Sequence, residues 1–485
     1  MGHVGASAGL RVTLSRSGVV SGTATAASPV TTYTVTITDS SGDTASQTFQ
    51  LSVSLSTVAV GPGSVDLGVE GSAVNAQFVA TGGTAPYYYT VADGALPAGV
   101  TLTSDGQLTG TATESGTFVF KLQVADANGS VGTRDVTLTV EARPDPTTDP
   151  TVRDTLQTQA DAMRRFAFAQ TQNVNSRLEL IRSCHDTAAA MQVQAAGQGG
   201  FSVANGDRAE VPVCDRPVAV WLSGTLLYGD EPGGSRVSTP GVTAGVDLRV
   251  RDNFILGIGI GAGYDSSDAG KGGDNSGDSY SFMSYGSWTL AKSLRLEGVL
   301  GYGSASLTSK RTTSYNGTRV RGTRDADQVF GSLTLAGDLL YGRLSLQPYL
   351  RTDYETSQLH SYRERGDGSL SLRYYGADSD TLQLTGGLRG LWSIPTTFGV
   401  LQPMLRLEYR NVDGNDLRQP IGYADGIGGQ YMLTVDRPGY DSGVAGVGLG
   451  FMLTHGVAGS FEWQSSFGGD SQDDSLLSAD VSWGF

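Results

Sequence analysis

The segment VLQPMLRLEYR, residues Val400 to Arg410, alternates apolar with polar side chains. In an extended strand, Leu405 and Leu407 share one face while Arg406 and Glu408 share the other. A soluble sandwich would not fill its core face with arginine and glutamate. The alternation therefore predicts a strand of a transmembrane β-barrel, with lipid outside and water and charge inside.

The segment 381–392 repeats the pattern, because Leu388 and Trp392 oppose Arg389. We therefore expect a set of charged side chains to face the barrel lumen, namely Arg389, Arg406, Glu408 and Arg410. All five tryptophans of the chain lie after residue 216, and we assign residues 217–485 to the barrel. The alternation predicts about twelve strands, at 218–228, 240–250, 254–264, 279–290, 294–306, 327–341, 344–357, 380–393, 400–411, 441–454, 457–467 and 475–485.

The connections between these strands differ in length. Short turns are expected at 251–253, 291–293, 342–343, 394–398 and 455–456, and long polar loops near 265–278, 307–326, 358–379 and 412–440. Short periplasmic turns and long external loops are typical of outer-membrane barrels. An even number of strands places both ends of the barrel segment on the short-turn side.

A helix is predicted ahead of the barrel. Residues 152–183 contain neither glycine nor proline and are rich in good helix formers. At about 1.5 Å per residue this helix could cross a bilayer, yet it carries five arginines, which could not face lipid. We therefore expect it to lie in water or inside a polar enclosure. The arginines are Arg153, Arg164, Arg165, Arg177 and Arg182.

The front of the chain contains a repeat. Residues 13–25 read TLSRSGVVSGTAT and residues 101–113 read TLTSDGQLTGTAT. Both copies alternate β-branched and apolar residues with Thr and Ser, which predicts β-sandwiches. We place a truncated repeat at 1–57, a full repeat at 58–141, a Pro-rich linker at 142–151, and the helix with its connector at 152–216.

The segment LPAGVTLTSDGQLTGTATESGTFVFKLQVADANGSVGTRDVTLTV, residues 96–140, resembles the Ig-like domains of bacterial surface proteins. Asp39 and Asp126 are each followed by glycine three residues later. They could be calcium ligands, or they could cap hairpin turns through their own backbone. The start MGHVGASAGL lacks the features of a signal peptide, so we expect the natural precursor to carry a signal peptide and further repeats.

Residues 152–485 resemble a classical, type V autotransporter. The resemblance rests on VWLSGTLLYG at 220–229, on the glycine-rich block 241–267 and on the closing SWGF. It implies an all-β chain with one helix, in which a passenger precedes a helix that runs inside a twelve-stranded translocator barrel. It also implies a location in the Gram-negative outer membrane, with the passenger at the cell surface.

The same resemblance assigns roles to residues. The barrel segment carries 21 Lys and Arg against 29 Asp and Glu, so its lumen suits a basic helix. The pore-helix residues expected to contact the lumen are Arg164, Arg165, Asn173, Asn175, Arg177 and Arg182. The last strand resembles a barrel assembly signal formed by Val481, Trp483 and Phe485. The partners implied are outer-membrane lipid, the barrel assembly machinery, periplasmic chaperones and an unidentified surface ligand of an adhesive or stalk-like passenger.

Two further features concern processing. Residues 172–182 resemble the motif of a self-cleaving autotransporter subgroup, but the cyclising Asn is replaced by Gln172 ahead of Asn173. We therefore expect the chain to stay uncleaved. Cys184 and Cys214 are a disulfide candidate, because an oxidising compartment favours pairing.

Other functions find little support in the sequence. A net charge of −15 argues against nucleic-acid binding. The four histidines are widely spaced, and the sequence contains no G-x-S-x-G elbow, no H-E-x-x-H motif and no plausible Ser/His/Asp set, so we expect no enzyme, no metal and no cofactor. An outer-membrane channel or barrel hydrolase with periplasmic Ig-like domains is the alternative interpretation.

Overall fold

The computed structural model describes the chain except residues 1, 4–9, 25–26, 197–216, 232–234, 269–272, 454–455, 469–472 and 485. It divides into two compact units, Met1–Arg143 and Pro144–Phe485. No helix within the described ranges is both long and apolar enough to span a membrane.

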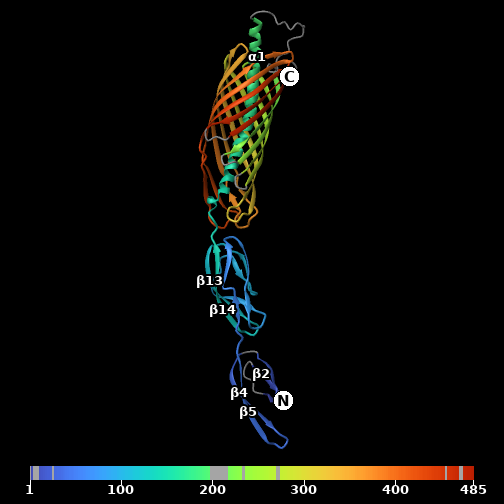
Figure 1. The fold of residues 1–485 in the computed structure, drawn as a ribbon, viewed down its shortest axis with the longest axis vertical. Helices are drawn as coiled ribbons and strands as arrows, with labels where there is room; N and C mark the ends of the chain where they lie inside the picture. The colour runs from blue at the N-terminus through green and yellow to red at the C-terminus, as the bar shows by residue number, and fades with distance from the viewer. Residues whose placement is uncertain are drawn as a thin grey trace. The chain divides into compact units, whose positions relative to one another are not determined.

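The first unit, here called the Ig-like segment, is built from short strands that form small sheets (Figure 1). In its second repeat, a four-stranded sheet β10-β13-β14-β7 faces a three-stranded sheet β11-β12-β8. Their inner faces bury one apolar core that includes Phe78, Leu108, Phe120, Leu122 and Leu138, as expected for a β-sandwich. The strands are β1 (Gly2–His3), β2 (Leu10–Leu14), β3 (Val20–Ala24), β4 (Ser28–Thr38), β5 (Thr44–Val53), β6 (Ala59–Gly61), β7 (Ser64–Val69), β8 (Ala73–Gln77), β9 (Val79–Thr81), β10 (Tyr88–Gly94), β11 (Val100–Leu102), β12 (Gln107–Thr111), β13 (Gly116–Ala125) and β14 (Val131–Glu141).

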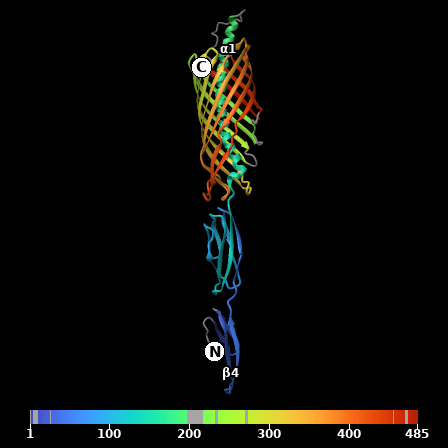
Figure 2. The same ribbon diagram turned by 90° about the vertical axis from the view of Figure 1, so that its left-hand side faces the viewer.

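The second unit is a closed antiparallel barrel around one long helix (Figures 1 and 2). Neighbouring strands pair in chain order, β20 pairs β22, and β15 pairs β32 to close the ring. The prediction of a twelve-stranded barrel is confirmed within the described residues. Its strands are β15 (Val218–Glu231), β16 (Ser235–Arg251), β17 (Phe254–Asp268), β18 (Asp274–Ala291), β19 (Leu294–Thr312), β20 (Arg319–Gly337), β22 (Leu344–Leu359), β25 (Ala377–Trp392), β27 (Gly399–Gly414), β30 (Tyr440–Leu453), β31 (Val457–Phe467) and β32 (Asp473–Gly484).

The alternation of β27 separates lipid-facing from lumen-facing side chains. Leu405 and Leu407 are 64% and 61% exposed on the outer face, whereas Arg406 is 1% exposed inside the barrel. The same outward apolar pattern recurs on the other strands, for example at Ile260 and Leu350. A hydrocarbon environment outside and a polar one inside explain both faces.

Two predicted loops are wrong. The segments 265–278 and 307–326 are mostly strand, because β17 continues to Asp268, β18 begins at Asp274, β19 continues to Thr312 and β20 begins at Arg319. Beyond the bilayer both faces of a hairpin meet water or protein, so the apolar alternation fades while the backbone pairing continues. A prediction based on the apolar alternation therefore makes these strands too short.

The other two predicted loops, 358–379 and 412–440, fold together into a four-stranded sheet of order β23-β24-β28-β29. We call this sheet the cap. Its strands are β23 (Tyr362–Arg363), β24 (Leu372–Tyr374), β28 (Leu417–Tyr423) and β29 (Tyr431–Val435). The unit is completed by the short strands β21 (Leu339–Tyr341) and β26 (Ile394–Thr396), the 3-10 turn η1 (Pro146–Thr148) and the helix α1 (Pro150–Ala196).

Candidate functional site: the helix in the barrel lumen

Helix α1 runs lengthwise through the barrel (Figures 1 and 2). Asp149 is the N-cap of this helix, because its carboxylate accepts the backbone N–H of Thr151 at 2.9 Å. Such a hydrogen bond stabilises the start of a helix. From Thr155 to Ser183 nearly every side chain is buried by the barrel or the cap. The helix packs chiefly against β15 to β19 and only lightly against β25 and β31.

Acidic side chains of β16, β17 and β19 hold the arginines of the helix. The arrangement is a series of buried ion pairs in which Arg165 Nε lies 2.8 Å from Asp265 Oδ2, Arg177 Nε lies 2.9 Å from Asp247 Oδ2, and Arg182 Nη2 lies 2.6 Å from Glu297 Oε2. The first two pairs are bidentate. Such forked contacts fix the orientation of a guanidinium group as well as its position.

The opposite wall is basic and holds the acidic residue of the helix. Glu179 accepts hydrogen bonds from Arg406 at 2.6 and 3.0 Å and lies 3.5 Å from Arg389. Arg406 also pairs with Glu462 at 2.6 Å and with Glu408 at 3.1 Å. The arginines of the helix thus face carboxylates of one wall, on β16, β17 and β19, and Glu179 faces arginines of the other wall, on β25 and β27.

This division of charge constrains the helix. Removing one partner of a buried ion pair costs about 3–5 kcal/mol, because the remaining charge is left without compensation. A rotation of α1 about its axis would bring Arg165 and Arg177 toward Arg406, and Glu179 toward the carboxylates of β16 and β19. The two walls therefore specify the rotation and the register of the helix.

The amides of the helix are also placed by the barrel. Asn173 donates from Nδ2 to Thr243 Oγ1 at 2.9 Å and accepts a hydrogen bond from Ser223 Oγ at 3.2 Å. Asn175 is buried, and its Nδ2 has no hydrogen-bond partner among the described residues. Arg164 is only partly buried and donates to the Tyr440 hydroxyl at 3.3 Å.

Glycines of the barrel make room for aromatic side chains next to the ion pairs. A Cβ added to Gly257 would lie 2.1 Å from the ring of Tyr285, and one added to Gly245 would lie 2.5 Å from the ring of Trp221. Trp221 donates to the Tyr285 hydroxyl at 2.5 Å, and that hydroxyl donates to Asp247 at 3.3 Å. The glycine strings of β16 and β17 therefore support the carboxylate that holds Arg177.

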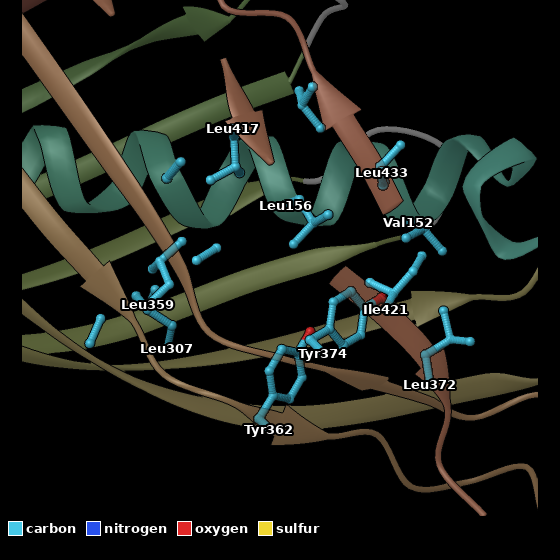
Figure 3. Close-up of a cluster of buried hydrophobic side chains, with 14 of the residues drawn as sticks. Val152, Leu156, Leu307, Leu359, Tyr362, Leu372, Tyr374, Leu417, Ile421 and Leu433 are labelled. Atoms are coloured by element: carbon cyan, nitrogen blue, oxygen red, sulfur yellow. The ribbon is translucent and has the colours of Figure 1, made fainter. Parts of the chain in front are cut away.

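The first half of α1 meets a different environment. An apolar cluster surrounds it, and Figure 3 shows side chains of the helix, the barrel and the cap converging there. The expectation of a wholly polar enclosure is wrong for this half, because the cap brings its own apolar face to the helix. The cluster includes Val152, Leu156, Met163, Phe166, Leu307, Leu359, Leu372, Tyr374, Leu417, Ile421, Leu433 and Val435.

Two arginines of the barrel fasten the cap. Arg311 forks onto Glu364 with Nε–Oε1 2.6 Å and Nη2–Oε2 2.7 Å, and its Nη1 lies 3.3 Å from Asp149. Arg324 is fully buried and donates to Gln159 of the helix at 3.0 Å and to Gln419 of the cap at 2.9 Å. Barrel, helix and cap are thus joined at each of these two points.

Sequence reasoning missed the partners Asp247, Asp265 and Glu297 and the whole cap. From the sequence, Asp265 falls in a predicted loop, and the acidic lumen is predicted without particular carboxylates. A signal for the cap was present, since Val152 and Leu156 are apolar on a helix expected in a polar pore. That spacing, continued to Met163, indicates one face in need of apolar cover.

The remaining predicted residues lie elsewhere. On β32, Val481 pairs with Leu222 and Trp483 pairs with Val220 of β15, so both lie at the closing seam of the barrel. Phe485 and Cys214 lie outside the described residues, as does the side chain of Cys184.

Asp39 and Asp126 lie in hairpin turns of the Ig-like segment. The Asp126 carboxylate accepts the backbone N–H groups of Thr84, Asn128 and Ser130 at 2.6 to 3.0 Å. Burial opposes ionisation, but these donors outweigh it and hold the pKa of Asp126 below its usual range. Asp39 likewise accepts the backbone N–H groups of residues 41 and 43. Both carboxylates therefore cap turns.

Comparison with known proteins agrees with this architecture. The family model described as autotransporter beta-domain matches residues 220–464, and the one described as "Putative Ig domain" matches residues 10–54 and 58–141. None of the curated proteins matches the chain.

Solved structures similar to the chain include translocator barrels. The translocator domain of the autotransporter NalP from Neisseria meningitidis is 17% identical, with a TM-score of 0.45 over 62% of this chain and 98% of that one. The β-domain of the Bordetella autotransporter BrkA is 15% identical, with a TM-score of 0.45 over 56% of this chain and 100% of that one. With its family model covering half of the sequence, the chain belongs to the autotransporter β-domain family and is an outer-membrane protein with a surface-displayed passenger.

Proposed function

We propose that the barrel anchors the chain in the Gram-negative outer membrane and displays its own Ig-like segment, still attached, as a stalk or adhesive surface element. The observation that carries the proposal is the direction of α1 inside the barrel. Its N-terminal end, which is joined to the Ig-like segment, lies at the cap, and its C-terminal end lies at the short turns.

The ion pairs and the apolar cluster define this direction. Arg182 pairs with Glu297, three residues after β19 begins at a short turn, whereas Arg165 pairs with Asp265, three residues before the opposite end of β17. Val152 packs within the cluster formed with the cap. Short turns of such barrels lie in the periplasm, so the cap end and the chain leading into α1 lie outside the cell.

Two features support an uncleaved chain. Position 172 is glutamine, and its longer side chain would need a larger ring to attack its own backbone carbonyl. The following Asn173 donates its amide hydrogens to Thr243 Oγ1 at 2.9 Å and to the Gly241 carbonyl at 3.4 Å. In both hydrogen bonds the side-chain nitrogen of Asn173 is the donor, so the barrel holds this nitrogen in place.

A non-enzymatic role is supported by how the lumen charges are used. Glu179, Asp247, Asp265 and Glu297 each pair with an arginine across the helix–barrel interface. Carboxylates held in such ion pairs serve to position the helix. We further propose that the final strand is read by the barrel assembly machinery, that periplasmic chaperones escort the chain, and that the Ig-like segment meets a surface ligand.

The test is protease treatment of intact cells that express the chain behind a signal peptide. Separate antibodies against the Ig-like segment and the barrel would follow the two parts. Loss of the Ig-like signal while the barrel band survives is the expected result. Protection of the Ig-like segment until the outer membrane is permeabilised would contradict the proposal.

Cleavage is tested in the same blots. The parent chain should migrate as one full-length band in untreated cells. Gln172→Asn restores an Asn-Asn pair and should allow two bands, whereas Thr171→Asn, its neighbour, serves as the matched control and should give one. Two bands from the parent chain would show that it is cleaved.

A further inference from the structure

We propose that the outer face of the cap, together with the end of β20 beside it, binds an anionic polysaccharide. Five arginines form this surface, here called the arginine patch: Arg319, Arg321, Arg363, Arg365 and Arg373. The proposal goes beyond the proposed function, because it assigns a binding site to the barrel unit and not to the Ig-like segment. It rests on the proposed function only in that the orientation of the barrel makes the patch accessible from outside the cell.

Backbone pairing joins the strands that carry the patch into one surface. Arg321 on β20 and Arg365, which follows β23, exchange two backbone hydrogen bonds of 2.9 and 2.8 Å. Arg363 on β23 pairs with Arg373 on β24. Residues directly opposite one another in antiparallel strands share a face, and so do residues two apart along one strand, such as Arg319 and Arg321. The five side chains therefore lie on the same face of one sheet.

This face is the outer one. Glu364 is buried and pairs with an arginine on the inner side of β19, whereas its neighbours in sequence, Arg363 and Arg365, are exposed. Tyr374 lies among the apolar side chains around the helix (Figure 3). Since successive residues of a strand alternate between faces, Arg373 points away from the helix. The patch is therefore turned toward the surroundings of the barrel.

The protein does not neutralise the charges of the patch. Arg321 lies directly opposite Arg365, and Arg363 lies directly opposite Arg373. Like charges in such positions repel one another and destabilise a sheet. Within the part of the chain that the structure describes, none of the five arginines forms an ion pair, whereas Arg311 on the inner face of the same sheet pairs with a carboxylate at 2.6 Å. An anion that contacts several of the arginines together would relieve this repulsion.

The patch lies well above the lipid. On β20 the outward apolar side chains end at Val329, and Arg321 lies eight residues further toward the cap. At about 3.3 Å per residue and a strand tilt of about 40°, this separation is a height of about 20 Å. Headgroups extend only about 5–8 Å beyond the hydrocarbon. Asp325 and Asp327 lie on the same face in between and would repel anionic headgroups, so the partner is expected above the membrane surface.

An anionic polysaccharide meets these conditions. Guanidinium groups bind sulfate, phosphate and carboxylate through paired hydrogen bonds, and these are the charged groups of acidic sugars. A flexible sugar chain can contact the patch without approaching the acidic surface below it. Duplex DNA is stiff and densely charged, and it would meet Asp325 and Asp327 on a chain whose net charge is −15. The polysaccharide is therefore favoured over a nucleic acid.

The experiment is the binding of the purified full chain, in neutral detergent, to heparin, a sulfated polysaccharide. Arg321→Gln combined with Arg365→Gln should weaken binding about tenfold, because two exposed ion pairs with the ligand are lost. The salt dependence of binding should also become less steep, since fewer counterions are released. Arg251→Gln combined with Arg343→Gln is the matched control. It removes two exposed arginines at the short turns and should bind heparin as the parent does.

A second pair of substitutions guards against a local defect in the first. Arg363→Gln combined with Arg373→Gln should also weaken binding, and a heat-modifiable band would confirm a folded barrel in each variant. Equal binding of heparin by the parent and by both patch variants would overturn the proposal. Tighter binding of duplex DNA than of heparin, lost in the same variants, would also overturn it in favour of a nucleic-acid partner.

Intact cells distinguish failure of this proposal from failure of the proposed function. Cells that express the parent chain behind a signal peptide should bind fluorescent heparin, and cells that express Arg321→Gln with Arg365→Gln should bind less. If the purified chain binds through the patch but cells bind only after the outer membrane is permeabilised, the binding site stands and the proposed orientation is wrong. If neither binds, the binding site itself is refuted.

Discussion

The two halves of α1 meet opposite surroundings within one barrel. Val152, Leu156 and Met163 pack in an apolar layer formed with the cap and the barrel wall, whereas Arg165, Arg177, Glu179 and Arg182 lie among charges of opposite sign. Apolar burial is non-directional and excludes water, while forked ion pairs are directional and fix geometry. The comparison indicates that the upper half of the helix binds the cap and that the lower half fixes the position of the helix in the barrel.

The largest expected effect comes from the lower half. Arg406→Ala would leave Glu179, Glu408 and Glu462 with one fewer cation, and we expect a loss of about 3–5 kcal/mol. The temperature at which the barrel unfolds in detergent, followed by the band shift on gels, would measure this loss of stability. Arg363→Ala, at an exposed position of the cap, is the control. If both variants unfold at the same temperature as the parent, the ion pairs do not hold the helix.

The upper half should respond separately. Leu156→Ala removes a fully buried side chain from the apolar layer, at a cost of about 2–5 kcal/mol. Hydrogen exchange should quicken at amides of the cap, such as Leu372 and Ile421, and stay slow near Arg177. Met432→Ala should change neither. Equal acceleration in both halves would show that they form one cooperative unit.

A smaller effect is expected where the barrel makes room for the lower half. Gly257→Ala would place a methyl group against the ring of Tyr285, which supports Asp247, and overpacking of this kind costs about 1–3 kcal/mol. Gly298→Ala is the matched control, since the nearest atom to its added Cβ lies 3.9 Å away. Thermal unfolding of both variants would measure this cost. Equal unfolding midpoints for Gly257→Ala and Gly298→Ala would show that Gly257 is not needed to make room for Tyr285.

The smallest effect lies outside both halves, in the Ig-like segment. The pKa of Asp126 is lowered in the folded state, so its contribution to stability is present above the unfolded pKa of about 3.9 and is lost as the pH falls below it. Hydrogen exchange of residues 126–131, corrected for intrinsic rates, should quicken from pH 5 to pH 3. In Asp126→Asn that change should vanish, and persistence of the change would exclude Asp126 as its cause.

Much of the barrel could be predicted because its physics is local. Alternation of Leu405 with Arg406 follows from one strand between lipid and water, and the same rule located all twelve strands. The helix could be predicted from the lack of glycine and proline, and its place in the pore from its arginines together with the family resemblance.

The cap could not be predicted, because its strands are short and come from two distant connections. Leu372 lies between Ser371 and Arg373, Ile421 lies between Pro420 and Gly422, and only the folded barrel brings the two apolar residues together. The carboxylates Asp247 and Asp265 also depend on the register between helix and strands, which no local pattern sets. What the sequence does contain is an unexplained apolar face at Val152 and Leu156, and that face marks where the cap binds.

The central claim is that the helix enters the barrel at the surface of the cell and ends on the periplasmic side. Single cysteines placed in a chain lacking Cys184 and Cys214 would test it, with a membrane-impermeant maleimide added to intact cells. Thr148→Cys, ahead of the helix, and Gly368→Cys, in the connection between β23 and β24, should label at once. Lys292→Cys, in a short turn, should label only after the outer membrane is permeabilised. Labelling of Lys292→Cys in intact cells, with Thr148→Cys protected, would contradict the account.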